Sequence, residues 1–196
     1  MPAMTRPMTQ GLDGSEAKMV LGRLFAPRPA ALAGKALYQR AAAQARNPVF
    51  YRDLGVADTV EGRFELFSLH VALVALRLKG QGPAAAETSQ RLFDAFLRGL
   101  DDALRELAVG DLAVPKRMKK LGEAFYGRMR SFEQALAARP DLGQLEELVT
   151  RTVLESSAHG RPKALAGYVA AAADRLDAAA LGDLLEGQVD WPEAPT

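Results

Sequence analysis

The chain has 196 residues, of which 48% are hydrophobic and 25% charged, and its formal net charge is +1. This length and composition are typical of one globular domain with a sizeable core, and the near-neutral charge gives no global signal for DNA binding. The absence of cysteine excludes disulfides and thiolate metal sites.

Residues 1–18, MPAMTRPMTQGLDGSEAK, are rich in Pro, Gly, Thr and Met and have no periodicity, which predicts a disordered leader. A targeting peptide is disfavoured because the leader contains Asp13 and Glu16. Met19 begins a more apolar segment and is an alternative translation start. We expect a helical domain over residues 19–185 and an extended tail over residues 186–196, which carries the only tryptophan.

The first predicted helix is Ala-rich and runs from Ala30 to Arg46. It should end there, because Pro48 disfavours the helical region for the residue before it. Phe50 and Tyr51 follow in a short connection, where two adjacent aromatic residues usually anchor the chain to a core. Gly55 can supply a positive φ for the turn that comes next.

The second predicted helix runs from Asp58 to Lys79. Asp58 is the expected N-cap, with Glu61 as a capping-box-like partner, and Gly80 should end the helix. The apolar run from Phe64 to Leu78 is shorter than the ~20 residues of a membrane span and contains charged residues. The sequence therefore favours a buried central helix of a soluble bundle over a transmembrane helix.

Three polar residues of this helix, Arg63, His70 and Arg77, are seven apart and should lie along one side. In one interpretation, His70 is a hydrogen-bonded core histidine and both arginines form internal ion pairs. In the other, the three form a polar stripe in an apolar groove that receives acidic or carbonyl groups of a client protein. The candidate client-binding residues are then Phe50, Tyr51, Asp58, Arg63, Phe64, Phe67, His70 and Arg77.

Four more helices are predicted after a linker over residues 80–87. An amphipathic helix over residues 87–107 carries leucine and phenylalanine on one face, and another begins at Pro115 with a Met/Phe stripe. A short helix over residues 145–155 and an Ala-rich helix over residues 162–181 complete the domain. Since no segment alternates long enough for a confident strand, the expected fold is an all-α, single-domain bundle of about six or seven helices.

The helix that begins at Pro115 is locally basic, although the chain as a whole is almost neutral. One interpretation is a solvent-exposed basic face. The other is attraction to an anionic surface, namely acidic lipid headgroups, ribosomal RNA or an acidic partner. The candidate residues facing a membrane or ribosome are Lys116, Arg117, Lys119, Lys120, Arg128 and Arg130.

Enzyme and cofactor signatures are missing from the sequence. Gly34 and Lys35 do not form a phosphate-binding loop, because Ala36 replaces the needed Ser or Thr and Pro29 replaces the first glycine. There are two histidines, far apart in sequence, so a histidine-based metal site is not expected. We expect no catalytic activity, no cofactor and no metal.

Two segments together resemble the ubiquinol–cytochrome c chaperone family. They are RNPVFYRDLGVADTVEGRFELFSLHVALVALRLK, which begins at Arg46, and LRELAVGDLAVPKRMKKLGEAFYGRMRSFEQAL, which begins at Leu104. The resemblance extends from about residue 37 to about residue 181. It implies a non-enzymatic assembly factor that binds newly made cytochrome b and promotes assembly of respiratory complex III.

The resemblance also implies partners and a place in the cell. Mitochondrial members act with a small partner protein, near the ribosomal exit and the inner membrane. The Ala-, Arg- and Leu-rich composition suggests a bacterial member, for which we expect residence in the cytoplasm, peripheral to the inner membrane. Two alternatives stay open, namely a helical regulator that binds RNA through the basic helix, and a lipid- or quinone-binding protein.

Overall fold

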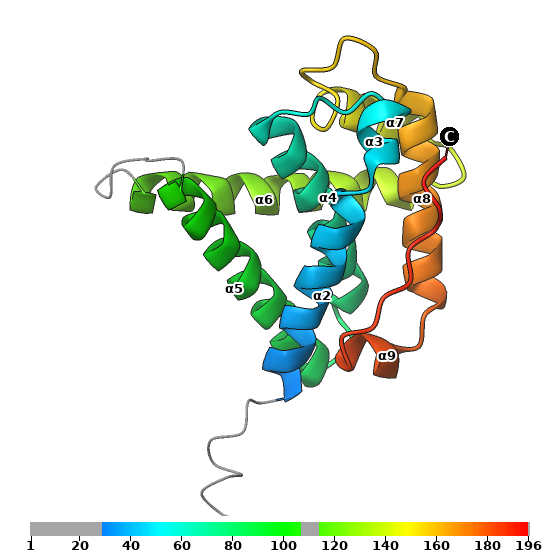
Figure 1. The fold of residues 1–196 in the computed structure, drawn as a ribbon. Coiled ribbons are helices and arrows are strands. Elements are labelled where there is room, and N and C mark those ends of the chain that lie inside the picture. Colours follow the sequence, from blue (N-terminus) through cyan, green and yellow to red (C-terminus); the bar gives the residue numbers. More distant parts are fainter. Residues whose placement is uncertain (1–28, 107–113, 196) are drawn as a thin grey trace, which may run out of the picture.

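The computed structural model describes residues 29–106 and 114–195, and within these ranges it contains helices and no strand (Figure 1). The all-α prediction is confirmed. The predicted leader and Met19 lie outside the described residues. Two short helices, α3 and α9, were not expected. The helices are α2 (Pro29–Ala45), α3 (Pro48–Arg52), α4 (Val60–Leu78), α5 (Pro83–Glu106), α6 (Val114–Ala137), α7 (Gly143–Thr150), α8 (Pro162–Ala178) and α9 (Leu181–Leu185).

Helix α4 is the centre of the bundle. It packs against α2, α5, α6 and α8, and its residues from Ser68 to Val74 are all buried. A helix that is apolar around its whole circumference has to be covered on every side, which is how the neighbours are arranged. Among the described helices, none combines the length and the hydropathy that a membrane crossing requires.

The N-terminus of α4 differs from the prediction by one residue. Thr59, and not Asp58, is the N-cap, since its hydroxyl accepts a hydrogen bond from the backbone N–H of Gly62 at 3.1 Å. Threonine can cap a helix in the same way as aspartate, so the sequence left two adjacent candidates. The end of the helix follows the prediction, because Gly80 has a φ of +74° directly after Lys79.

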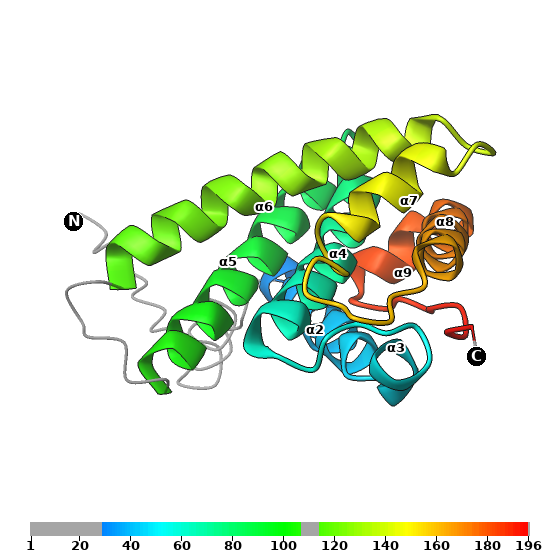
Figure 2. The ribbon, with the colours of Figure 1, turned by 90° about the horizontal axis from the view of Figure 1, so that it is seen from above.

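The C-terminal part of α5 and the N-terminal part of α6 extend beyond the rest of the bundle on one side (Figures 1 and 2). The predicted apolar faces meet the core, where Phe96 and Phe132 are almost completely buried. Helix α5 begins at Pro83, four residues before the predicted start, because proline is well suited to the first helical turn. The predicted linker is therefore shorter than expected.

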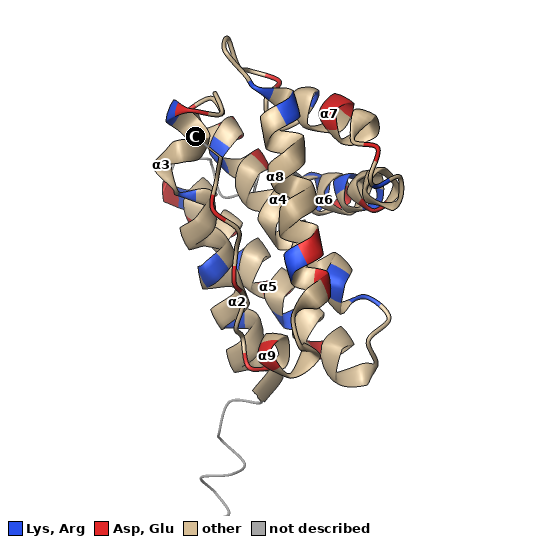
Figure 3. Cartoon of the chain, turned by 90° about the vertical axis from the view of Figure 1, so that its right-hand side faces the viewer, with Lys and Arg blue, Asp and Glu red and all other residues tan. Residues whose placement is uncertain are grey.

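The last part of the chain closes the bundle on the opposite side. Helix α7 ends at Thr150 rather than at residue 155, and α8 ends at Ala178 rather than at residue 181. After α9, residues 186–195 run without helix back along α8 and α2 (Figures 1 and 3). We refer to residues 186–195 as the C-terminal strap.

Candidate functional site

A groove of about 800 Å³ lies between α4 and α5, and we call it the α4–α5 groove. The end of α2, the helix α3 and the start of α6 complete its walls. Its lining is mainly apolar, with two arginines and two glutamates. The lining residues are Ala42, Ala45, Arg46, Tyr51, Val60, Glu61, Arg63, Phe64, Phe67, Leu100, Ala103, Leu104, Glu106 and Leu121.

The floor of the groove is built from aromatic rings that are fixed by the core. Phe64 and Phe67 are one helical turn apart on α4, and both rings pack on the buried Phe96 of α5, with centroid distances of 6.2 and 5.3 Å. Tyr38 of α2 meets Phe67 edge-on at 5.4 Å. Because contacts with Phe96 and Tyr38 fix the rings of Phe64 and Phe67, the floor presents a preformed apolar surface.

One rim of the groove carries an arginine on an aromatic ring. The guanidinium of Arg63 lies 5.5 Å from the ring centroid of Tyr51, within the range of a cation–π contact. The Tyr51 hydroxyl donates to the carbonyl oxygen of Ala45 at 2.6 Å, which fixes the ring. Asp58 accepts a hydrogen bond from Arg63, and that bond holds the pKa of Asp58 below its usual value. Arg63 is thus positioned at the groove while its side chain stays exposed.

Two of the predicted client-binding residues are completely buried and do not line this groove. Phe50 and His70 have no exposed surface and lie in the core, in contact with each other at a centroid distance of 5.5 Å. A client cannot touch them in this conformation, so we remove both from the proposed contact surface. For His70, the structure agrees with the alternative of a hydrogen-bonded core histidine.

His70 is the centre of a buried chain of hydrogen bonds. Its Nδ1 lies 2.8 Å from the carbonyl oxygen of Leu66, and its Nε2 lies 2.8 Å from the hydroxyl of Tyr168. Since a carbonyl can only accept, Nδ1 carries the proton and the Tyr168 hydroxyl donates to Nε2. Gln44 Nε2 donates in turn to the Tyr168 oxygen at 2.9 Å. This chain is complete with a neutral imidazole, and burial lowers the pKa of His70 to about 4.

This chain gives the fold a pH dependence. The imidazole pKa is 6.5 without the fold and about 4 within it, so on acidification the unfolded chain binds the proton first. The free energy of unfolding should therefore fall as the pH drops from 6.5 towards 4. The expected loss from His70 is about 1.4 kcal/mol per pH unit, or about 3 kcal/mol in all. Urea unfolding at a series of pH values measures it.

The matched variant for this prediction is His70→Gln, which keeps a hydrogen-bonding side chain but does not titrate. Carboxylates contribute equally to both proteins, so the difference between the two stability curves isolates the imidazole. The difference should be constant above pH 7 and change between pH 6.5 and 4. Parallel curves through this window would contradict a neutral, buried His70.

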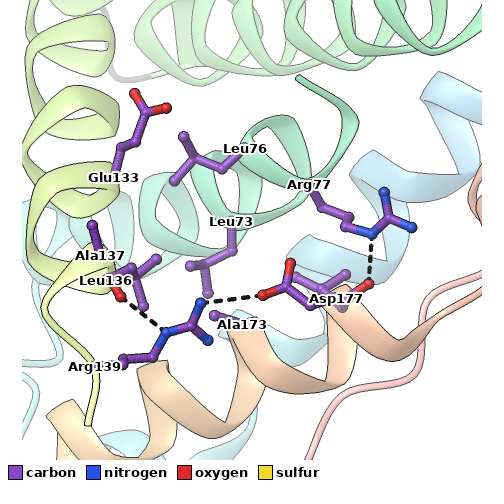
Figure 4. Close-up of a pocket in the computed structure, with 10 residues that line it drawn as sticks. Leu73, Leu76, Arg77, Glu133, Leu136, Ala137, Arg139, Ala173 and Asp177 are labelled. Atoms are coloured by element: carbon purple, nitrogen blue, oxygen red, sulfur yellow. Dashed lines mark hydrogen bonds and ion pairs between the residues drawn. The ribbon is translucent and has the colours of Figure 1, made fainter. Parts of the chain in front are cut away.

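Arg77, the third member of the predicted stripe, lies away from the groove and serves the fold. Its guanidinium donates to the carbonyl oxygens of Leu176 and Ala179 at 2.8 and 3.0 Å, at the C-terminal end of α8 (Figure 4). A cation there donates to carbonyls at the end of the helix and complements its dipole. Arg77 therefore has a helix-capping role, and its contact with a client stays a prediction.

Arg77 also lines a smaller pocket, of about 210 Å³, between α4, α6 and α8 (Figure 4). Its other charged side chains are engaged as well. Arg139 pairs with Asp174 and with Asp177, and Lys79 pairs with Glu133 at 2.6 Å. The charged side chains of this pocket therefore connect neighbouring helices, through ion pairs for Arg139 and Glu133 and through backbone carbonyls for Arg77.

The predicted basic set of α6 divides into two groups. Arg128 pairs with the largely buried Glu65 of α4 at 2.5 Å, so it holds α6 on α4, and its role at a membrane or ribosome stays a prediction. Burial raises the pKa of Glu65, and the charge of Arg128 opposes that rise. Lys119, Lys120 and Arg130 are exposed, whereas the side chains of Lys116 and Arg117 lie outside the described part.

Several residues that line the α4–α5 groove or that belong to the His70 hydrogen-bond chain were not predicted as functional. Leu100, Leu104 and Leu121 were assigned to core-facing stripes, and they reach the groove because these stripes extend past the core. Tyr168 and Gln44, which form the hydrogen-bond chain with His70, were also not predicted. The signal for Tyr168 was a single aromatic residue in an otherwise Ala-rich helix. Within the described residues, no group of three or more His, Asp or Glu side chains is placed to hold a metal ion.

Comparisons with known proteins find one matching family model and a similar solved structure. The family model described as ubiquinol-cytochrome C chaperone matches residues 52–191, from the end of α3 through α4, α5 and α6 to the strap. Among solved structures, the crystal structure of the Cbp3 homolog from Brucella abortus is similar, with 32% sequence identity and a TM-score of 0.79. The match covers 91% of this chain and 97% of that chain. No curated protein that was compared matches the chain.

Proposed function

The chain belongs to the ubiquinol–cytochrome c chaperone family, and we propose that it binds newly made cytochrome b and promotes assembly of the ubiquinol–cytochrome c reductase complex without catalysing a reaction. The proposed place of action is the cytoplasm of a bacterium, at the surface of the inner membrane. A small partner protein, which the resemblance implies, belongs to the same proposal.

We propose further that the α4–α5 groove is the client site. Cytochrome b is a multi-helix membrane subunit, and before assembly its helices expose apolar side chains. A groove with a rigid aromatic floor suits such side chains, because helices commonly bind by inserting an apolar face at helical spacing. The exposed Arg63 at the rim supplies a polar contact for a carbonyl or carboxylate of the client. The preformed, largely apolar lining of the groove is the observation that carries this proposal.

Val60→Glu is the variant that tests the groove. Val60 lines its mouth and is 57% exposed, and as the first residue of α4 it is a favourable position for an acid. The fold should therefore tolerate the change, while an apolar client must desolvate the new charge. Crosslinked affinity purification from solubilised membranes, followed by mass spectrometry, should show about a tenfold or greater loss of cytochrome b.

Leu32→Glu is the matched control, since Leu32 is 56% exposed near the start of α2 and does not line the groove. It should retain cytochrome b at the wild-type level. Cytochrome b at background in the wild-type sample would refute the client. Equal recovery in both variants would refute the groove and leave the client in place.

The exposed lysines of α6 support a second contact, with an anionic membrane or ribosome surface. Lys119 and Lys120 are exposed near the start of the helix, and Lys119 lies 3.9 Å from Glu123, also exposed, in a loose ion pair. Charge reversal of both lysines should reduce sedimentation with anionic vesicles or ribosomes, and the wild-type binding should weaken as salt is added.

A control for the lysine reversal is the pair Lys35→Glu and Arg40→Glu on α2, which changes the net charge equally at exposed positions elsewhere. Unchanged sedimentation of the α6 variant would mean that its lysines are only solvent-exposed. Equal loss in both double variants would indicate dependence on net charge alone.

A lipid- or quinone-binding role is the second candidate function, and the volume of the groove favours it. About 800 Å³ falls in the range of small-molecule sites, and the lining is mainly apolar. Organic extraction of the purified protein, with mass spectrometry of the extract, tests whether the groove holds a lipid or quinone. A lipid or quinone retained in equal molar amount, and lost in Val60→Glu, would favour this candidate over the chaperone groove.

A further inference from the structure

The C-terminal strap packs on the side of α4 away from the groove (Figures 1 and 3), and we call the surface beneath it the trough. It leaves α9, follows α8 and α2, and ends near α3 (Figures 1 and 3). Two apolar side chains anchor it: Val189 is 7% exposed, and the Trp191 ring meets the His70 ring edge-on at a centroid distance of 5.0 Å. The trough thus holds an extended segment whose main anchor is one aromatic residue.

The polar contacts that hold the strap are weak. Among the described residues beyond Gln188, one hydrogen bond reaches the helices, from Gln44 Nε2 to the carbonyl oxygen of Pro192, at a long 3.4 Å. Asp190 pairs with Arg175 at 2.9 Å, but these side chains are 79% and 52% exposed, so solvent screens the pair. The buried indole N–H of Trp191 has no partner within the described structure, and an unmade hydrogen bond of this kind favours release.

Release of the strap leaves the buried hydrogen bonds beneath it intact. His70, Tyr168 and Gln44 bond to one another and to a backbone carbonyl, and none of these bonds depends on the strap. If the strap leaves, the chain of hydrogen bonds stays intact, and the Gln44 amide becomes free to donate to another carbonyl. The floor therefore suits a segment that can be exchanged.

We propose that this trough is a second protein-binding site, which the strap blocks in cis and which accepts an extended partner segment with an aromatic residue followed by proline. The strap itself shows what the site binds. Its aromatic ring covers His70, and the carbonyl oxygen of the next residue accepts from Gln44. A partner with this chemistry gains the same contacts once it displaces the strap. The inference does not depend on the α4–α5 groove or on cytochrome b.

The test exploits the single tryptophan of the chain. In the full-length Trp191→Ala variant the protein has no tryptophan, so a synthetic peptide of residues 186–196, EGQVDWPEAPT, carries the only indole in the sample. Binding in trans should raise the fluorescence anisotropy of the peptide and shift its emission to the blue. A peptide of reversed sequence is the control, and it should bind at least about tenfold more weakly.

A second measurement uses the wild-type protein and needs no variant to fold. A peptide of residues 186–196 with phenylalanine in place of tryptophan should displace the strap and increase acrylamide quenching of Trp191. Binding to the wild type should be at least about tenfold weaker than to Trp191→Ala, because the intact strap competes at high effective concentration. No anisotropy change together with no added quenching would overturn the proposal, and so would equal binding of the reversed peptide.

Discussion

Replacing Gly34 by alanine is expected to destabilise the protein by about 2–3 kcal/mol. Helices α2 and α5 approach each other closely at this glycine. A Cβ there would lie 2.6 Å from the Cβ of Arg91 and 2.7 Å from the backbone nitrogen of Leu92. Because the atoms it meets belong to or adjoin the backbone, a side-chain rotation cannot relieve the overlap, and the helices have to separate. Urea unfolding of wild type and variant measures the change.

Gly167→Ala is the matched control, because Gly167 is also helical, on α8, and a Cβ there would meet nothing within 4 Å. That substitution should stabilise the protein by about 0.5–1 kcal/mol through helix propensity alone. Opposite signs for the two glycines would confirm the close approach of α2 and α5. A Gly34 variant as stable as the control would show that the two helices pack less closely than the structure has them.

The separation of α2 from α5 should also damage the α4–α5 groove. Ala42 and Ala45 of α2 form one wall, and Leu100 and Leu104 of α5 form another. Since α2 and α5 are in contact at Gly34, the distance between them there affects the width of the groove at Ala42, Ala45, Leu100 and Leu104. Recovery of cytochrome b by the Gly34→Ala variant should therefore fall at a temperature where the variant is still folded.

The sequence predicted the helices well because their apolar faces are long and regular. Helix α4 differs from its predicted bounds by at most two residues, and α6 starts one residue early. Helix α3 was missed because five residues are too few for a periodic pattern. The sequence did contain a start signal for this helix, namely an asparagine directly before a proline. In the structure Asn47 is the N-cap, and its side chain accepts a hydrogen bond from the backbone N–H of Val49.

The predicted polar stripe shows why residue roles were harder to predict than helices. Arg63, His70 and Arg77 share one side of α4 to within the drift of about 20° per seven residues. They are also spread over about 21 Å of the helix axis, at 1.5 Å per residue. The environment changes over that length, from the solvent-exposed rim to the closed core and then to the end of α8. Spacing fixes a side of a helix, but only tertiary packing decides what covers it.

The neighbours Phe50 and Tyr51 were predicted to act together at the client site, and the structure separates them. Phe50→Ala is expected to lower the free energy of unfolding by about 3–5 kcal/mol, because it empties a fully buried position. The Phe50 ring contacts Tyr168 at 4.9 Å and His70 at 5.5 Å, so its loss also leaves a cavity beside the buried hydrogen bonds. Urea unfolding at neutral pH gives the magnitude.

Tyr51→Phe and Tyr51→Ala complete this experiment, because Tyr51 lines the groove and is only half-buried. Tyr51→Phe loses the bond to Ala45 and should cost about 1 kcal/mol, while the cation–π contact with Arg63 remains. Tyr51→Ala also removes that contact and the groove wall, so cytochrome b recovery should fall although the protein stays folded. The reverse pattern, with Phe50→Ala stable and unable to bind the client, would return Phe50 to the contact surface.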